Sequence, residues 1–209
     1  MDISDGKNIK VFALLEYVID LKEEKLYGFR AVSKLFFGDN EVSFRDITDR
    51  SLKVRVETSV LETLRSFKRS EVMFINLPVS LEIEELPLYG RNLVLNLPIS
   101  MGFKNLFHYR NRAKKCGLKV ALDDFTTLGY ELKDTLFGSF DYVFFSDDFY
   151  TNASKANLSK AVKFIKFFGS KTCFKRIDTS KKLKLAKELD IDLGHGYLFG
   201  YDQIGVGIV

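Results

Sequence analysis

Apolar residues open the chain in two extended runs that predict a β-hairpin. Residues 10–20 and 26–37 are rich in apolar side chains, and a short polar turn at 22–25 joins them. Because a parallel pair needs a crossover of about a dozen residues or more, so short a connection requires the two strands to be antiparallel. Gly38, Asp39 and Asn40 then end the second strand.

From residue 56 onward the pattern alternates between helix and strand. Apolar residues recur at helical spacing from Val56 to Phe67, and the short β-rich runs that follow stop at Pro78 and Pro98. The predicted strands are 72–77, 93–97, 117–125, 142–145, 171–174 and 193–199, and the predicted helices are 56–67, 102–116, 130–136, 158–168 and 179–189. With the hairpin this predicts an α/β fold, a TIM-like (β/α)8 barrel with an antiparallel first strand. No linker or repeat interrupts it, so we expect residues 1–209 to form one domain.

The run Gly117–Phe125 ends in two adjacent carboxylates, Asp123 and Asp124. Its continuous apolar character is typical of a parallel strand that is covered on both faces. In α/β barrels the carboxyl ends of the strands are where ligands and metals bind. The pair is therefore a candidate site, although a solvated turn after the strand would leave the same pattern.

Composition narrows the class of protein. The chain is 46% apolar and 29% charged, and its net charge of +4 is mild. Basic residues are mixed with acidic ones, so a nucleic-acid surface is not implied. Two distant cysteines, Cys116 and Cys173, indicate a reducing compartment rather than a disulfide framework. The N-terminus lacks a signal-peptide pattern and no apolar run reaches about 18 residues, so we expect a cytoplasmic protein without a membrane partner.

Other catalytic signals are weak. There is no Gly-x-Ser-x-Gly elbow and no phosphate-binding glycine loop. His195 lies between two glycines, where a structural histidine is the simpler interpretation. Lys175, Arg176, Lys181 and Lys182 read as solvated charge. The strand ends that could add metal ligands to the aspartates offer mostly neutral groups, at Asn76, Asn96, Ser146 and Asp178.

The motifs at the ends of the chain's successive strands resemble, in their order, those of the EAL-domain family, the cyclic-di-GMP phosphodiesterases of bacterial signalling. The resemblance runs from about Leu15 to Tyr201, and it depends on motifs that are short but correctly ordered. These motifs are Ile75–Leu77, Ala121–Phe125, Ile177–Thr179 and Gly194–Gly200. The family's fold is a barrel whose first strand is antiparallel. The segments 74–78 and 84–87 also resemble the EAL portion of proteins with a following HDOD domain; this sequence contains no such domain, and a separate HDOD-type partner stays open.

Several functional positions of the family hold other residues here. Arg30 stands in place of the glutamate in the motif that names the family, and Asn96 and Lys175 replace two more glutamates. Phe144 takes the position of the catalytic lysine, and Ser146 that of an aspartate. His195 replaces a glutamine, and Asp178 is a conservative substitute for a glutamate. The expected residues remain at Asn76, Asp123 and Asp124.

The resemblance implies Mg or Mn in active members, and the substitutions predict that this chain has lost both the metals and the hydrolysis. We expect no catalytic residue, no metal site and no cofactor. We also expect the Arg30 guanidinium to pair with Asp123 or Asp124.

The leading hypothesis for function is an inactive EAL-like domain that regulates bacterial signalling by binding a protein partner. The alternatives are a cyclic-di-GMP sensor that does not hydrolyse its ligand, an active phosphodiesterase, and an unrelated barrel enzyme that uses His195 and the aspartates. A homodimer is left open. If a ligand binds, the candidate residues are Arg30, Asn76, Asp123, Asp124, Lys175, Arg176 and His195.

Overall fold

The computed structural model describes residues 9–66, 70–78, 81–88, 92–126 and 139–208. The helix predicted at 130–136 and the end of the helix predicted at 56–67 lie outside these residues.

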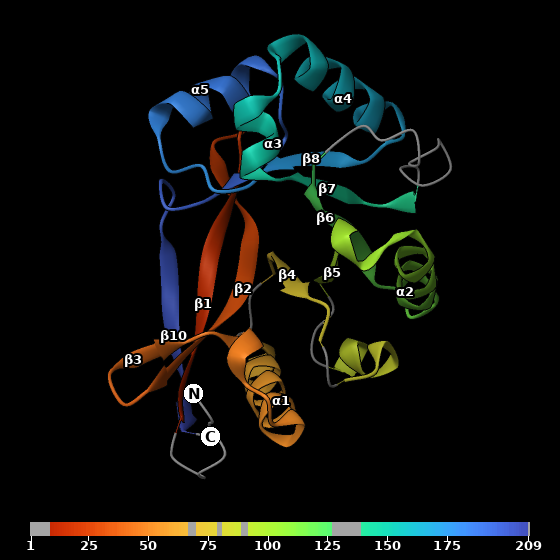
Figure 1. The fold of residues 1–209 in the computed structure, drawn as a ribbon. Helices are drawn as coiled ribbons and strands as arrows, with labels where there is room; N and C mark the ends of the chain where they lie inside the picture. Colours follow the sequence, from red (N-terminus) through yellow and green to blue (C-terminus); the bar gives the residue numbers. More distant parts are fainter. Residues whose placement is uncertain (1–8, 67–69, 79–80, 89–91, 127–138, 209) are drawn as a thin grey trace.

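Eight of the described strands close into a barrel (Figure 1). In spatial order they are β1 (Ile9–Asp20), β9 (Leu193–His195), β8 (Lys171–Phe174), β7 (Tyr142–Phe145), β6 (Lys119–Phe125), β5 (Leu93–Pro98), β4 (Val72–Asn76) and β2 (Lys25–Phe37), which pairs with β1 again. Strand β1 is antiparallel to both of its barrel neighbours, and the other pairs are parallel. The predicted fold class is confirmed.

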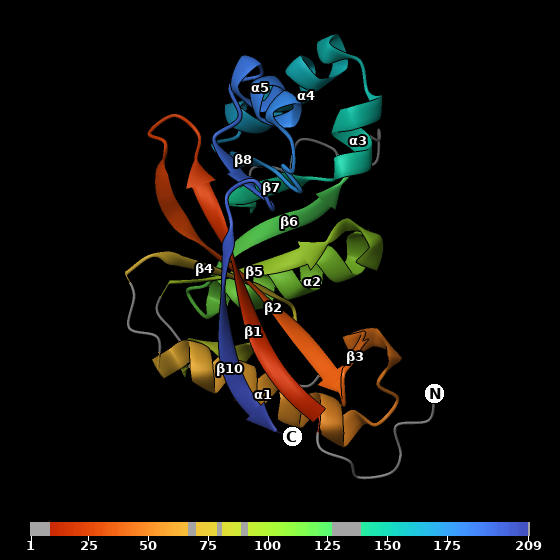
Figure 2. The same ribbon diagram turned by 90° about the vertical axis from the view of Figure 1, so that its left-hand side faces the viewer.

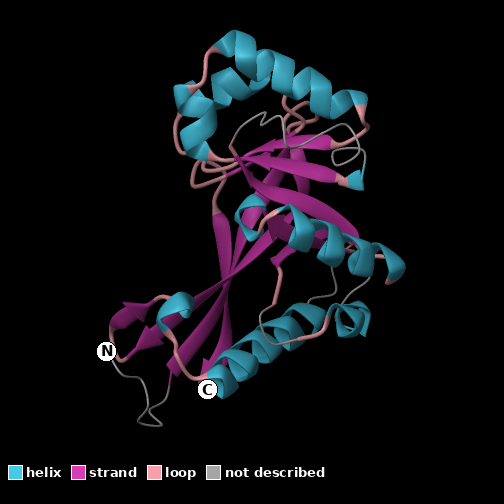
Figure 3. Cartoon of the chain, turned by 45° about the vertical axis from the view of Figure 1, so that its right-hand side comes forward, coloured by secondary structure: helices cyan, strands magenta, loops and turns pink. Residues whose placement is uncertain are grey.

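Helices lie around the strands, as Figure 3 shows by colour. The α-helices are α1 (Arg50–Ser66), α2 (Phe103–Lys115), α3 (Asp147–Asn152), α4 (Lys155–Phe167) and α5 (Ser180–Glu188); the 3-10 turns are η1 (Phe44–Asp46), η2 (Ile83–Leu88) and η3 (Ile99–Met101). The side chains of Ser146, Ser154 and Thr179 cap α3, α4 and α5 by accepting a backbone N–H. Sequence analysis did not predict α3. No helix in the described ranges is long and apolar enough to cross a membrane.

A four-stranded antiparallel sheet extends from the barrel (Figure 2). The first half of β1 pairs with β10 (Tyr201–Ile208), and the end of β2 pairs with β3 (Asn40–Val42). The predicted strand at 193–199 was too long, because the chain turns at Gly196 with φ 149°. A Cβ at this position would lie 2.4 Å from the backbone nitrogen of Ile177, so the turn requires glycine.

The barrel interior holds a small apolar cluster that positions the site. Its buried members are Val18, Phe74, Val94, Ala121, Tyr142, Phe144, Cys173 and Leu193. Side chains on a strand alternate between the two faces, so residues two positions further along the same strands also point inward. That step leads from Ala121 to Asp123, from Cys173 to Lys175 and from Leu193 to His195. The apolar cluster therefore lies beneath a polar layer at the carboxyl ends of the strands.

Candidate functional site

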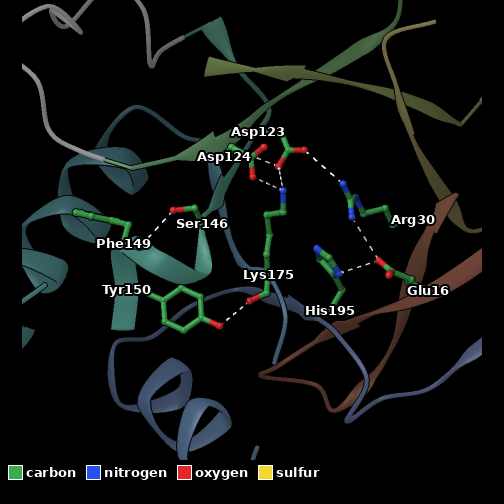
Figure 4. A network of polar contacts seen from close by, with 9 residues as sticks. All are labelled: Glu16, Arg30, Asp123, Asp124, Ser146, Phe149, Tyr150, Lys175 and His195. Carbon is green, nitrogen blue, oxygen red and sulfur yellow. Dashed lines mark hydrogen bonds and ion pairs between the residues drawn. The ribbon is translucent and has the colours of Figure 1, made fainter. Parts of the chain in front are cut away.

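Charged side chains at the barrel mouth form one network of polar contacts (Figure 4). Asp123 and Asp124 come from the end of β6, Lys175 directly follows β8, and Arg30 lies on β2. Lys175 is 7% exposed and Asp123 is 4% exposed. Because burial removes water from these charges, they must satisfy one another.

Lys175 joins the two aspartates. Its Nζ lies 2.7 Å from Asp123 Oδ1 and 2.5 Å from Asp124 Oδ1. Asp124 adopts φ 57°, and its backbone N–H donates to Asp123 Oδ1 at 2.8 Å. The lysine backbone is held as well, because the Tyr150 hydroxyl donates to its carbonyl at 2.6 Å. The interpretation of Lys175 as solvated charge was wrong: its ammonium is the centre of the site.

Arg30 forms the other side of the network. Its Nη2 lies 3.6 Å from Asp123 Oδ2, which is the pairing expected from the sequence, and its Nη1 lies 3.4 Å from Glu16 Oε2. Glu16 faces Arg30 across the β1–β2 pair. Sequence analysis did not identify Glu16 as a member of the site.

His195 completes the network next to Glu16. Its Nδ1 lies 3.2 Å from Glu16 Oε2, and the ring is 1% exposed. Burial lowers the pKa of His195, and the charges of Arg30 and Lys175 lower it further, although Glu16 opposes them. The neutral imidazole is therefore favoured. Burial raises the pKa of Asp123, but the charges of Arg30 and Lys175 outweigh it and hold this pKa below its usual value, so the carboxyl is ionised.

Phe144 fills the space beneath the charged layer. It is fully buried, with its ring centroid 5.2 Å from that of Phe74 and 5.8 Å from that of His195. Phe74 also packs edge-on against Tyr142 at 5.0 Å. An aromatic ring that is enclosed in this way offers neither a charge nor a proton donor to the mouth of the barrel.

Comparison with known proteins shows what this architecture resembles. No protein-family model matches the chain, and no curated protein matches it significantly. Solved structures do match. The EAL-domain protein YkuI of Bacillus subtilis, in complex with substrate c-di-GMP and calcium, is 14% identical with a TM-score of 0.74 over 92% of this chain and 55% of its own. The PaMucR phosphodiesterase in complex with c-di-GMP is 12% identical with a TM-score of 0.74, over 93% of this chain and 97% of its own.

The chain has the EAL-domain fold. BlrP1 of Klebsiella pneumoniae, in a calcium/cy-diGMP complex, supports the same conclusion at 16% identity and a TM-score of 0.74, over 94% of this chain and 57% of that one. This chain therefore spans less than two thirds of the length of YkuI and BlrP1. At these identities the comparison shows the fold, and the chemistry has to be argued from the residues.

Two asparagines predicted for the EAL-like site are not joined to the ion-pair network by any hydrogen bond between described residues. Asn96 is 1% exposed, and its Oδ1 and Nδ2 form no hydrogen bond with the described residues. Asn76 is exposed at the end of β4. It lines a pocket of about 310 Å³ between α1, β2 and β4, together with Ser33 and Leu61 among others.

Three further predicted residues lie outside the network. Ser146 caps α3, accepting from Phe149 N at 3.2 Å. Asp178 pairs with Lys182, whose Nζ lies 3.0 Å from its Oδ1. Arg176 is exposed and has φ 54°. Among the described residues, no side-chain hydrogen bond or ion pair joins any of the three to Lys175 or Asp123. The structure thus brings Arg30, Asp123, Asp124, Lys175 and His195 into one network and places Phe144 beneath it, and it leaves Ser146, Arg176 and Asp178 outside this network.

The EAL resemblance implies bound metal ions, and the side chains of the site can be compared with what a metal ion requires. Within the described ranges, no three side chains of His, Cys, Asp or Glu form a group that could hold a metal ion. Asp123 and Asp124 share the Lys175 ammonium, and Arg30 approaches the other oxygen of Asp123. A divalent ion needs several oxygen ligands. It would have to displace the ammonium to reach these two, so the residues present do not fit it.

Proposed function

We propose that this chain is an EAL-like domain without phosphodiesterase activity that regulates bacterial signalling by binding another protein. The observation that carries the proposal is the Lys175 ammonium, which lies within hydrogen-bond distance of both aspartates. It provides inside the protein the positive charge that a metal-dependent hydrolase takes from bound cations. A cytoplasmic location remains a prediction.

Electrostatics supports the loss of hydrolysis. Two unit charges about 4 Å apart interact by about 4 kcal/mol at an effective dielectric near 20. A divalent cation placed beside Lys175 and Arg30 would meet repulsion of at least this size, and the two aspartates are already neutralised. Metal-assisted hydrolysis needs cations that lower the pKa of the attacking water. Phe144 also argues against hydrolysis, because this buried ring stands at the position of the family's catalytic lysine and offers no amine.

Exposed apolar side chains support a role in binding a protein. Tyr197, Leu198 and Tyr201 follow the last barrel strand and are 77%, 43% and 48% exposed. Such groupings of large apolar side chains on a surface are typical of protein contact sites, and tyrosine is enriched among the residues that dominate binding energy.

A non-hydrolysing cyclic-di-GMP sensor is the second candidate. The neighbouring structures YkuI, PaMucR and BlrP1 hold this nucleotide, and the exposed Arg176 of this chain could meet a phosphate. Against it, the Lys175 ammonium uses two of its three donors on the aspartates, which leaves one for a phosphate.

Calorimetric titration with cyclic-di-GMP, with and without Mg²⁺ or Mn²⁺ and followed by product analysis, tests the proposal. PaMucR phosphodiesterase serves as the positive control for the reagents. We expect neither heat nor product from this chain. Linear product would contradict the proposal, and heat without product would replace it with the sensor.

A further inference from the structure

The helices α4 and α5 carry much of the positive charge of the protein. The two helices contain eight of its 32 Lys and Arg but one of its 28 Asp and Glu. The rest of the chain has 24 basic and 27 acidic residues, so it is slightly negative. The mild overall charge therefore hides one strongly basic region, and the two helices that form it lie side by side at one end of the molecule (Figures 1 and 2).

The outer side of α4 presents lysines around an exposed ring. Lys160, Lys163 and Phe167 follow one another at intervals of three and four, which places them on one side of the helix. Leu158 and Ile165 lie on the opposite side and are buried. Phe167 is 83% exposed, the most of any large apolar residue that the structure describes.

The neighbouring helix α5 also exposes lysines. Lys181 and Lys184 are exposed, and the opposite side of the helix buries Ala186. Two ion pairs join α4 to the end of α5 and to the turn after it: Lys155 Nζ lies 2.7 Å from Glu188 Oε2, and Lys166 Nζ lies 2.8 Å from Asp190 Oδ2. These pairs neutralise the acids between the helices.

Of the lysines on α4 and α5, four have no carboxylate within ion-pair distance among the described residues. We call them, together with Phe167, the basic face: Lys160, Lys163, Lys181, Lys184 and Phe167.

We propose that the basic face binds an acidic protein segment that places carboxylates on the four lysines and an apolar side chain against Phe167. The inference rests on the proposed function and adds to it the surface and the chemistry of the partner. Charge complementarity selects acidic partners, and contact with the ring selects among them.

Two other anionic partners fit less well. A membrane-bound helix buries a continuous apolar side in the bilayer. The apolar side of α4 is packed against the protein, and on the outer side Phe167 is the one exposed large apolar residue of this helix. Nucleic acid presents phosphates of one sign along its length. Glu188 and Asp190 are exposed among the lysines in their ion pairs, so this surface carries charges of both signs. A protein partner, unlike nucleic acid, can carry charges of both signs and so match both the lysines and the acidic residues beside them.

Fluorescence anisotropy with synthetic peptides tests the proposal on the full chain. The first probe is a helical peptide of about 20 residues with glutamates on one side and leucines among them. The second has serine in place of each leucine. The variants are the charge reversal K160E/K163E/K181E/K184E and Phe167→Ser. A matched reversal on exposed lysines elsewhere, K22E/K104E/K115E/K119E, controls for net charge, and circular dichroism verifies folding of each variant.

We expect the wild-type chain to bind the leucine peptide, and the basic-face reversal to weaken it at least about tenfold, since each exposed pair contributes about 0.2–1 kcal/mol. The control reversal should change binding less than about threefold. Phe167→Ser should weaken the leucine peptide but not the serine peptide. Equal loss in both reversals, or no peptide binding, would overturn the proposal.

Two more outcomes separate the proposals from each other. Binding to duplex DNA, or to phosphatidylcholine vesicles with about one third phosphatidylserine, without binding to either peptide would also overturn the basic face as a protein site. The hydrolysis assay on the same preparations is independent of this face. Failure of peptide binding in a chain that yields no nucleotide product would refute only the basic face, and nucleotide product would refute the proposed function.

Discussion

Replacing Lys175 by Met removes the ammonium between the two aspartates while keeping most of the volume of the side chain. Lys175 is 7% exposed and Asp123 is 4% exposed, so Asp123 loses a buried partner 2.7 Å away. Removing one member of a buried ion pair costs about 3–5 kcal/mol of unfolding free energy. Arg30 remains 3.6 Å from Asp123, and the Asp124 side chain is 51% exposed. Both reduce the penalty, and we expect a loss of about 3 kcal/mol.

Urea denaturation at neutral pH measures this loss, and Lys182→Met is the matched control. Lys182 also contacts two aspartates, with its Nζ 2.9 Å from Asp147 Oδ1 and 3.0 Å from Asp178 Oδ1, but Asp178 is 44% exposed. Pairs of this kind contribute about 0.2–1 kcal/mol each, so the control should lose much less than Lys175→Met.

The pH dependence gives a second readout of the same contact. The pKa of Asp123 in the folded state is lowered, so its contribution to stability is present above the unfolded pKa of about 3.9 and is lost as the pH falls through the folded value. The difference between wild type and Lys175→Met should therefore shrink in acid. Adding Asp123→Asn to Lys175→Met should recover about 1–2 kcal/mol, because the stranded charge is gone. A loss below about 1 kcal/mol in Lys175→Met, or no recovery in the double variant, would refute the reasoning.

Other contacts yield predictions of the same kind. Phe144→Ala should lower the unfolding free energy by about 3–5 kcal/mol in urea, because the ring is fully buried inside the barrel. Burial lowers the folded pKa of His195, so the wild-type chain should lose stability as the pH falls below the unfolded value of about 6.5; His195→Gln should flatten thermal unfolding curves there, and an unchanged slope would contradict a neutral imidazole. Tyr17→Phe removes a donor 2.6 Å from Asp202 Oδ1 and should cost about 1.5–3 kcal/mol, with faster amide exchange in β10 as the local readout.

The barrel was predictable because its strands are continuous apolar runs with clear ends. The polar turn at 22–25 alone determined that β1 and β2 are antiparallel. By contrast, β10 contains Gly205 and Gly207, and none of its residues is fully buried. Its place beside β1 follows from the fold rather than from its own residues.

The site was predictable only in part. Asp123 and Arg30 were expected to pair, and they do. Glu16 was missed for a geometric reason: counting back from the turn, Ile19 opposite Leu26 would place Glu16 opposite Phe29, but a bulge near Val18 shifts the register so that Glu16 faces Arg30. A one-residue shift reverses which side chains point inward.

Lys175 was named as a site position, but its burial and its partners were not predicted, for a different reason. Its burial depends on where β6 and β8 end in space and on the left-handed backbone of Asp124, which has φ 57°. Neither is encoded in the local pattern around Lys175, where the exposed Arg176 follows directly. Sequence alone therefore indicated charge at this position but not its partners.

Titration of the chain with Mn²⁺ by calorimetry tests the central claim most directly. The claim is that the ammonium of Lys175 and the guanidinium of Arg30 have replaced bound cations at Asp123 and Asp124. The matched variant R30E/K175E removes both internal cations and supplies two carboxylates at the same positions. The account predicts no saturable heat from wild type up to about 1 mM Mn²⁺ and saturable binding by the variant. Stoichiometric Mn²⁺ binding by the wild-type chain would contradict it.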